Sequence, residues 1–129
     1  MNVLMFSPGF PDELPAFTEG LAEAGARVVG LGDQPAEMLP ERARHALAHY
    51  VRVDHLWDQE ALTDTVREID RRFPLDRIEC LWEPGVLLAA QLREAMELPG
   101  LSVEQARLFR DKELMKRRLD ECGIRTPRH

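Results

Sequence analysis

The chain has 129 residues, enough to close one hydrophobic core and too few for two, so we expect a single domain. Apolar residues make up 44% of it and charged residues 31%, the balance of an ordinary soluble globular protein rather than a disordered chain. The formal net charge of −6 argues against a nucleic-acid-binding surface, which needs clustered cations.

The cysteines and the amino terminus indicate the cellular compartment of the protein. Cys80 and Cys122 lack the paired spacing of a zinc site or a disulfide scaffold, and we expect two buried thiols. No basic region precedes the first residues, MNVLMF, and no apolar run approaches the ~20 residues that span a bilayer. The sequence therefore predicts a cytoplasmic protein without a membrane partner.

The amino-terminal third of the chain reads as strand, helix and strand. Residues 3–6 form a continuous apolar run, typical of a strand buried on both faces of a parallel sheet, and the prolines and glycine of residues 7–11 indicate a loop. Gly25 ends the predicted helix, and a second strand follows at residues 27–31. The apolar positions of the helix, spaced three or four residues apart, are Leu14, Phe17, Leu21 and Ala24.

The middle of the chain continues this alternation. Residues 34–40 read as a loop and residues 41–47 as a short helix, before a third strand at residues 50–53. Asp58 is well suited to cap the helix that follows. That helix is amphipathic, and its apolar positions are Leu62, Val66, Ile69 and Phe73.

The next segment completes the expected sheet. A fourth strand is predicted at residues 78–82 and an apolar helix at residues 86–96, with a very short fifth strand within residues 98–100. Strands that alternate with helices predict an α/β fold: an open, mostly parallel, Rossmann-like sheet of four to five strands, with helices on both faces and a C-terminal helical linker. Such a sheet binds ligands outside the carboxyl ends of its strands, where we expect the turns at residues 7–11, 32–35, 54–58 and 83–85.

Three residues in these turns are candidates for a substrate cleft. Ser7 and Gly9 lie in the first turn, which lacks the three-glycine spacing of a dinucleotide site and so argues against a nicotinamide cofactor. Gly9 either contacts a ligand or only allows the chain to make a tight turn. Glu83 follows an apolar strand directly, and it is equally well explained as a carboxylate facing the cleft and as a helix-start carboxylate favoured by the helix dipole.

Two histidines have a spacing that metal sites use. His45 and His49 lie four residues apart, which would place both imidazoles on one helical face. No third ligand stands near them in the sequence, so a surface pair is the preferred interpretation and we expect no metal site in this chain. No Ser/His/Asp or Cys/His arrangement for nucleophilic catalysis can be argued from spacing.

The carboxyl-terminal segment predicts two helices. Ser102 and Gln105 have the form of a capping box, so a helix should begin at about Val103. A second helix should end near Cys122, because Gly123 is the expected left-handed stop. One face of this second helix is apolar and should pack; it carries Leu114, Met115, Leu119 and Cys122.

Residues 102–127 also contain several short motifs at defined spacings. They are Ser102-x-x-x-Ala106, Arg110-Asp111-Lys112, Met115-Lys116, Gly123-Ile124 and Thr126-Pro127. Together these residues resemble the segment that leads into the catalytic domain of ATP-grasp ligases, among them carboxylate–amine ligases and biotin carboxylases. The preceding residues agree with that family in their pattern of strands and helices.

The resemblance implies that residues 1–101 are the domain that precedes an ATP-grasp domain and that residues 102–129 are a helical linker between the two. In this family ATP converts a carboxylate to an acyl phosphate, which an amine or another nucleophile then captures. The resemblance therefore implies ATP and Mg²⁺ as cofactors, with the metal ligands outside this chain, and a small carboxylate and an amine as substrates. The ATP-grasp domain is the implied partner, and this chain alone would be inactive.

The resemblance also implies roles for individual residues. Lys112 matches a lysine that approaches the phosphates of the nucleotide, a role suited to a compact ammonium group; the alternative is an exposed helix lysine. Arg110 and Lys116 match further positions, which we assign to helix and interdomain salt bridges. Glu83 falls where the family directs residues toward the substrate or the nucleotide cleft. The turn at residues 7–11 lacks the glycine-rich form of biotin carboxylases, which favours a carboxylate–amine ligase.

Two other functions stay open at this stage. One is a stand-alone Rossmann-like domain that binds a small ligand or regulates another protein. The other is an interaction module whose basic C-terminal helix docks a partner, with exposed apolar surface around Leu114, Leu119 and Ile124. The apolar helix at residues 86–96 makes a homodimer a further candidate.

Overall fold

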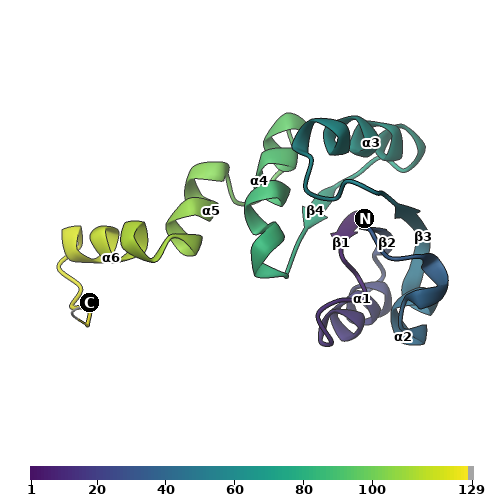
Figure 1. Cartoon of the computed structure of the whole chain (residues 1–129), viewed down its shortest axis with the longest axis horizontal. Coiled ribbons are helices and arrows are strands. Elements are labelled where there is room, and N and C mark those ends of the chain that lie inside the picture. The colour runs from purple at the N-terminus through teal and green to yellow at the C-terminus, as the bar shows by residue number, and fades with distance from the viewer. Residues whose placement is uncertain (128–129) are drawn as a thin grey trace.

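A computed structural model describes residues 1–127, and within these residues a four-stranded sheet has the strand order β3-β2-β1-β4 (Figure 1). All neighbouring strands are parallel, which confirms the predicted open α/β sheet, and residues 98–100 form a bend instead of a fifth strand. The elements in chain order are β1 (Asn2–Phe6), α1 (Leu14–Glu23), β2 (Arg27–Gly32), η1 (Ala36–Met38), α2 (Glu41–Ala46), β3 (Leu47–Arg52), α3 (Gln59–Arg72), β4 (Arg77–Glu79), η2 (Glu83–Gly85), α4 (Val86–Ala95), α5 (Val103–Arg110) and α6 (Lys112–Glu121).

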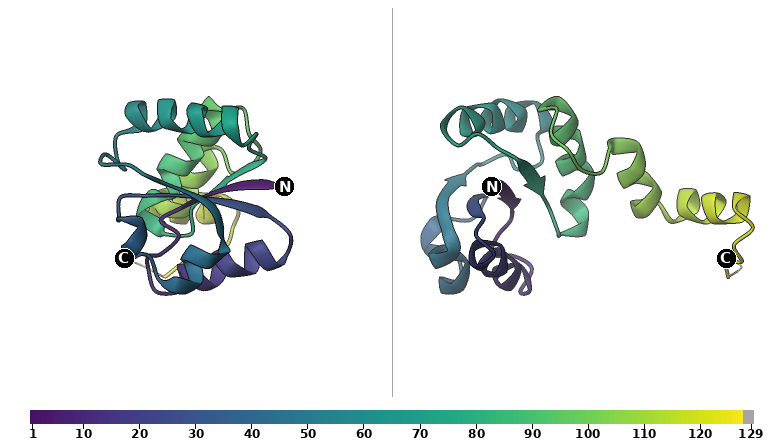
Figure 2. Two further views of the ribbon diagram at one scale, coloured as in Figure 1. Left: turned by 90° about the vertical axis from the view of Figure 1, so that its right-hand side faces the viewer. Right: turned by 180° about the vertical axis from the view of Figure 1, so that it is seen from behind.

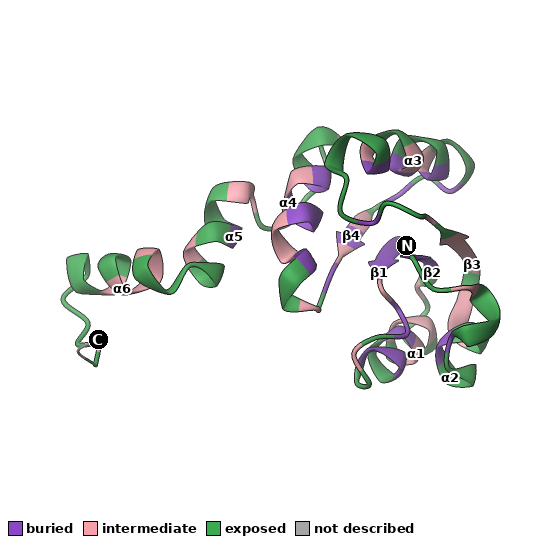
Figure 3. Cartoon of the chain, viewed as in Figure 1, coloured by how far each residue is buried: buried purple, intermediate pink, exposed green. Residues whose placement is uncertain are grey.

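Helices cover both faces of the sheet, and each face has its own hydrophobic core (Figures 2 and 3). Successive side chains of a strand point to opposite faces, so Leu4 of β1 lies in one core and Met5 in the other. The smaller core joins Met5 to Leu14 of α1 and Val28 of β2. The larger core lies against α3 and α4, and its members on these helices are Leu62, Val66, Ile69, Leu88, Ala89 and Leu92.

The order of the strands creates a switch point beside β1. The chain steps outward from β1 to β2 and β3, and then returns to place β4 on the other side of β1. The helix on the return path, α3, covers the face opposite α1, as right-handed crossovers in both directions require. In open parallel sheets the ligand crevice lies outside the carboxyl ends of the two strands at this switch point. Here those strands are β1 and β4.

The caps that the sequence predicts are confirmed. The carboxylate of Asp58 accepts hydrogen bonds from the backbone N–H groups of Glu60 and Ala61, both at 3.1 Å, at the start of α3. Ser102 and Gln105 form both bonds of a capping box, and α5 begins at Val103 as expected. These caps depend only on neighbouring residues, which is why sequence pattern alone locates them.

Three further details of the predicted elements are wrong. Phe17 does not pack: it is 54% exposed, and Thr18 is buried in its place because its hydroxyl donates to the carbonyl groups of Leu14 and Pro8. Strand β3 begins at Leu47, directly after α2, and so includes the last residue of the predicted helix and two residues that precede the predicted strand. Strand β4 ends at Glu79, where its pairing with β1 stops, and not at residue 82.

The last helix, α6, projects away from the sheet domain as an arm (Figures 1 and 2). It ends at Glu121 with Cys122 as its cap and Gly123 at φ 72°, as predicted. None of its residues is buried, so the expectation that its apolar face packs is only partly met. Leu114, Met115 and Leu119 are half-buried, whereas Cys122 is exposed.

A buried arginine joins the sheet to the segment that leads to α5. Arg93 of α4 is only 5% exposed, and its guanidinium group donates to the carbonyl oxygens of Ile78 at 2.7 Å and Leu101 at 3.2 Å. A carboxylate oxygen of Glu79 lies 3.9 Å from the same group. Gly100 passes directly over this side chain with φ 144°, and a Cβ there would lie 2.6 Å from Arg93 Cδ. The segment therefore needs glycine at this position.

We expect Arg93→Met to lower the free energy of unfolding by about 2–3 kcal/mol, because two carbonyl groups lose a charged donor. Urea denaturation followed by tryptophan fluorescence measures this change. Arg71→Met is the matched control, since Arg71 is an exposed residue of α3 and its loss should change the free energy by less than about 0.5 kcal/mol. Equal effects of the two substitutions would contradict the role of Arg93.

Candidate functional site

Three aromatic side chains from three loops meet at the carboxyl edge of the sheet. The rings of Phe10 and Trp82 are perpendicular, with centroids 5.3 Å apart, and thus join the loops that follow β1 and β4. Trp57, from the loop between β3 and α3, lies 5.3 Å from Trp82. We call Phe10, Trp57 and Trp82 the aromatic cluster. Phe10 is 46% exposed and Trp57 51%, so this cluster presents apolar surface at the switch point.

The first loop is held tightly against its neighbours around Ser7 and Gly9. The backbone N–H of Ser7 donates to the carbonyl of Leu31 at 2.7 Å, and its carbonyl accepts from the N–H of Phe10 at 3.1 Å. A Cβ on Gly9 would lie 2.9 Å from side-chain atoms of Leu39 and Pro40. The structure therefore explains Gly9 by close packing against the loop at residues 33–40.

A small depression beside Ser7 and Gly9 is closed by a tyrosine. Tyr50 of β3 donates a hydrogen bond from its hydroxyl to the carbonyl of Gln34 at 2.8 Å. Burial, with the negative charge of Asp33, raises the pKa of Tyr50 above its ordinary value. The depression leaves no room for a ligand of the size of water. Any ligand at this edge would have to lie outside it.

The turn that carries Glu83 follows β4 and is tied at two points. The thiol of Cys80 donates to the carbonyl of Trp82 at 3.2 Å, and burial raises the pKa of this thiol. Glu83 is exposed at the first position of η2, and its backbone carbonyl accepts from Arg110 Nη1 at 2.5 Å. Arg110 thus bonds to a backbone oxygen, not to a carboxylate as a salt bridge would require. The Glu83 carboxylate is free to face either solvent or a ligand.

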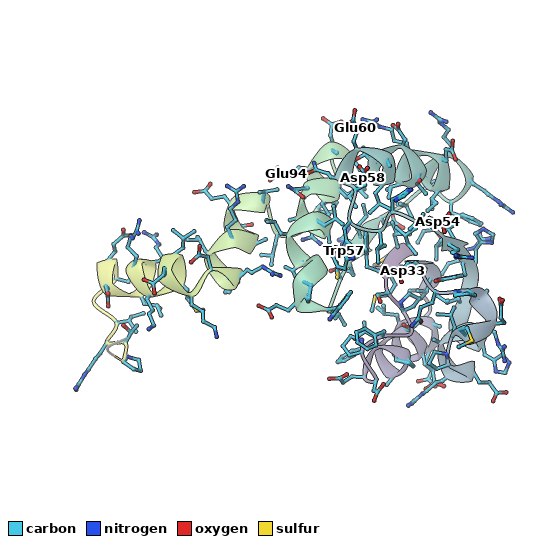
Figure 4. The ribbon with its side chains drawn as sticks, in the orientation of Figure 1. Asp33, Asp54, Trp57, Asp58, Glu60 and Glu94 are labelled. Atoms are coloured by element: carbon cyan, nitrogen blue, oxygen red, sulfur yellow. The ribbon has the colours of Figure 1, made fainter. Side chains whose placement is uncertain are left out.

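Two other carboxylates at the same edge have partners within the domain. Asp54 pairs with Arg52 at 3.1 Å, and Asp58 caps α3; both belong, like Trp57, to the segment between β3 and α3 (Figure 4). Within residues 1–127, no group of three or more His, Cys, Asp and Glu side chains is arranged to hold a metal ion. The prediction that His45 and His49 share one helical face is wrong, because His45 lies in α2 and His49 on β3.

The predicted site residues do not all come together. Ser7 and Gly9 share one loop, and the contact of Phe10 with Trp82 joins that loop to the turn of Glu83. Lys112 lies instead at the first position of α6, on the arm. Sequence reasoning missed Phe10 and Trp82 as members of the site, although Phe10 lies in the turn after the first predicted strand and Trp82 is the last residue of the fourth predicted strand. It also expected Cys122 to be a buried thiol, which is wrong because the arm leaves it exposed.

A four-stranded parallel sheet with helices on both faces and an open switch point defines a Rossmann-like α/β domain. The family model of the ATP-grasp N-terminal domain matches residues 19–100. The chain therefore belongs to the ATP-grasp N-terminal domain family. No curated protein matches the chain.

The solved structures that resemble the chain include two that match nearly its whole length. An L-amino acid ligase from Bacillus licheniformis is 27% identical with a TM-score of 0.80, and the match covers 98% of this chain and 31% of that one. A phosphoribosylglycinamide synthetase from Anaerococcus prevotii is 18% identical with a TM-score of 0.70, over 98% of this chain and 30% of that one, which shows the fold alone. The chain spans about a third of the length of these structures.

None of the helices described for residues 1–127 is long and apolar enough to cross a membrane.

The two cysteines should differ in reactivity. We expect a disulfide reagent such as DTNB at pH 8 to modify Cys122 at least about tenfold faster than Cys80, because Cys122 is exposed whereas Cys80 is buried with a raised pKa and so less thiolate. Stopped-flow absorbance should resolve a fast and a slow phase. The Cys122→Ser variant should keep only the slow phase, and the rate of that phase should increase as the pH is raised. A single fast phase in this variant would contradict the burial of Cys80.

Proposed function

We propose that this chain is the N-terminal domain of an ATP-dependent carboxylate–amine ligase. The observation that carries the proposal is the family match together with the likeness to an L-amino acid ligase over 98% of the chain. In the proposed reaction a carboxylate oxygen attacks the γ-phosphorus of ATP, which gives an acyl phosphate and ADP. The amine then attacks the acyl carbon, and an amide and inorganic phosphate are released.

The proposal divides the protein into units. Residues 1–101 form the Rossmann-like domain and residues 102–129 the linker, whose last two residues lie outside the described range. An ATP-grasp domain, on a longer polypeptide, would supply most of the nucleotide site. ATP-grasp ligases generally use Mg²⁺, but the described residues offer no set of ligands for it, so we place the metal in that other domain. The isolated chain would then be inactive.

The carboxyl edge of the sheet is the region of this chain that we assign to the substrate. It lies at the switch point, where parallel sheets bind ligands, and Ser7 and Glu83 stand on the two loops that meet there. The aromatic cluster would supply an apolar wall for the carbon skeleton of the carboxylate or the amine. Gly9 contributes by allowing the first loop to pack closely.

The proposed nucleotide contact from this chain is Lys112. The chain has only two lysines, Lys112 and Lys116, and both lie on α6. Lys112 is exposed in the first turn of that helix, directly after Asp111, whose carboxylate accepts hydrogen bonds from the backbone N–H groups of Glu113 at 2.9 Å and Leu114 at 3.1 Å. Because Asp111 already caps this helix terminus, a bound phosphate group would be attracted by the ammonium group of Lys112 and not by free backbone N–H groups.

Substitution of Lys112 tests the nucleotide role. In the longer protein, we expect Lys112→Ala to raise KM for ATP or lower kcat by about tenfold or more, because a cation next to the transferred phosphoryl group is lost. Initial rates of ADP release, measured with a coupled assay, give both constants. Lys116→Ala is the control on the same helix and should change them by less than about twofold. Unchanged kinetics in Lys112→Ala would remove Lys112 from the site.

Substitution of Trp82 tests the substrate edge. We expect Trp82→Ala to raise KM for one organic substrate by about tenfold and to leave KM for ATP within about twofold, because the apolar wall is lost. Trp82→Phe should retain most of the affinity. The control is Phe17→Ala, since Phe17 is also an exposed aromatic residue but lies on α1 and not on one of the three loops that form the cluster. If Trp82→Ala and Phe17→Ala behave alike, the cluster does not bind substrate.

A further inference from the structure

Helix α5 is packed on the sheet domain rather than extended from it. Ala106, in its centre, has no exposed surface, and α5 lies beside α4 (Figure 3). The backbone N–H of Val103 donates to a carboxylate oxygen of Glu94 at 2.7 Å, and the carbonyl of Leu101 accepts from buried Arg93. The start of α5 is therefore bound to α4 by two charged side chains.

The other end of α5 is bound to the carboxyl edge. Arg110 is its last residue, and Arg110 Nη1 donates to the carbonyl oxygen of Glu83 at 2.5 Å. This bond joins residues 27 positions apart in the chain. Its acceptor belongs to the turn that also carries Trp82, the residue at the centre of the aromatic cluster. The charged guanidinium group makes a directional hydrogen bond, and although this bond is exposed to solvent, it links the turn to the end of α5.

The chain becomes free of the sheet domain one residue later. Asp111 is the C-terminal cap of α5 and also the N-terminal cap of α6, with extended backbone angles of φ −86° and ψ 108°. A single extended residue thus separates a helix that is bound at both ends from one that has no buried residue. Lys112 is the first residue beyond this point. A change in the two backbone angles of Asp111 would redirect α6 and Lys112 relative to α5 and would change the contacts between these two helices.

We propose that Arg110 is a positioning residue for the substrate edge, which holds the Trp82–Glu83 turn in place on the fixed side of a hinge at Asp111. The inference rests on the proposed function for its kinetic consequences. It moves the boundary of the rigid domain from residue 101 to Arg110. It also separates two roles by position: the turn that faces the substrate is fixed by Arg110, and the proposed phosphate-binding lysine can reorient beyond it.

Hydrogen exchange measures the positioning directly. In the longer protein we expect Arg110→Ala to increase the exchange rate of backbone amides in residues 82–88 by about threefold or more, because the turn loses its external hydrogen bond. Arg110→Lys, which keeps a cationic donor, should give a smaller increase. Arg107→Ala is the matched control, since Arg107 is an exposed arginine one turn earlier on the same helix. Equal exchange in Arg110→Ala and the control would overturn the proposal.

Steady-state kinetics separate positioning from a role in nucleotide binding. We expect Arg110→Ala to raise KM for an organic substrate about three- to tenfold, with KM for ATP and kcat within about twofold. An equal rise in KM for ATP would overturn the positioning role, because Arg110 would then act on the nucleotide. If the wild-type protein releases no ADP with any carboxylate and amine, the proposed function fails, and the exchange experiment still decides whether Arg110 holds the turn.

Discussion

Parallel strands can be joined only by crossovers, and this constraint shapes the whole domain. Because the chain places β2 and β3 on one side of β1 and β4 on the other, the loops that follow β1 and β4 emerge next to each other. The rings of Phe10 and Trp82 meet edge to face across this point, and Trp57 joins them from the loop after β3. The candidate site is thus a consequence of strand order, since its residues are far apart in the chain.

Two arginines bind the segments that follow the sheet to the sheet domain. Arg93 is almost wholly enclosed and binds carbonyl groups on both β4 and the segment before α5, so the position of that segment depends on a buried charge with three oxygen neighbours. Arg110 then binds the end of α5 back to the turn of Glu83. Together they make α5 a component of the domain. The arm formed by α6 begins only after these contacts end.

The sequence predicts well whatever depends on near neighbours or on regular spacing. Asp58, Ser102 and Gly123 mark helix ends by local chemistry, and buried apolar runs mark the strands. Burial of single residues is harder to predict, because it depends on which element lies opposite. Thr18 is buried instead of Phe17 because the carbonyl of Pro8 is there to accept its hydroxyl.

Contacts between distant segments lie beyond any local pattern. The two arginine contacts and the aromatic cluster are of this kind, and the sequence analysis found neither. Ser7, Gly9 and Glu83 could be placed at the correct edge from topology alone, yet the structure gives Gly9 a packing role and leaves the ligand contacts of the other two as proposals. 

The measurement that tests the central claim most directly follows oxygen from the carboxylate substrate. The natural polypeptide that carries this sequence would be supplied with ATP, an amine and a carboxylate labelled with ¹⁸O, and the released phosphate analysed by mass spectrometry. An acyl phosphate intermediate predicts that each amide formed is accompanied by ADP and one phosphate that carries a single ¹⁸O atom. Release of unlabelled phosphate, or of AMP and pyrophosphate in place of ADP, would contradict the account.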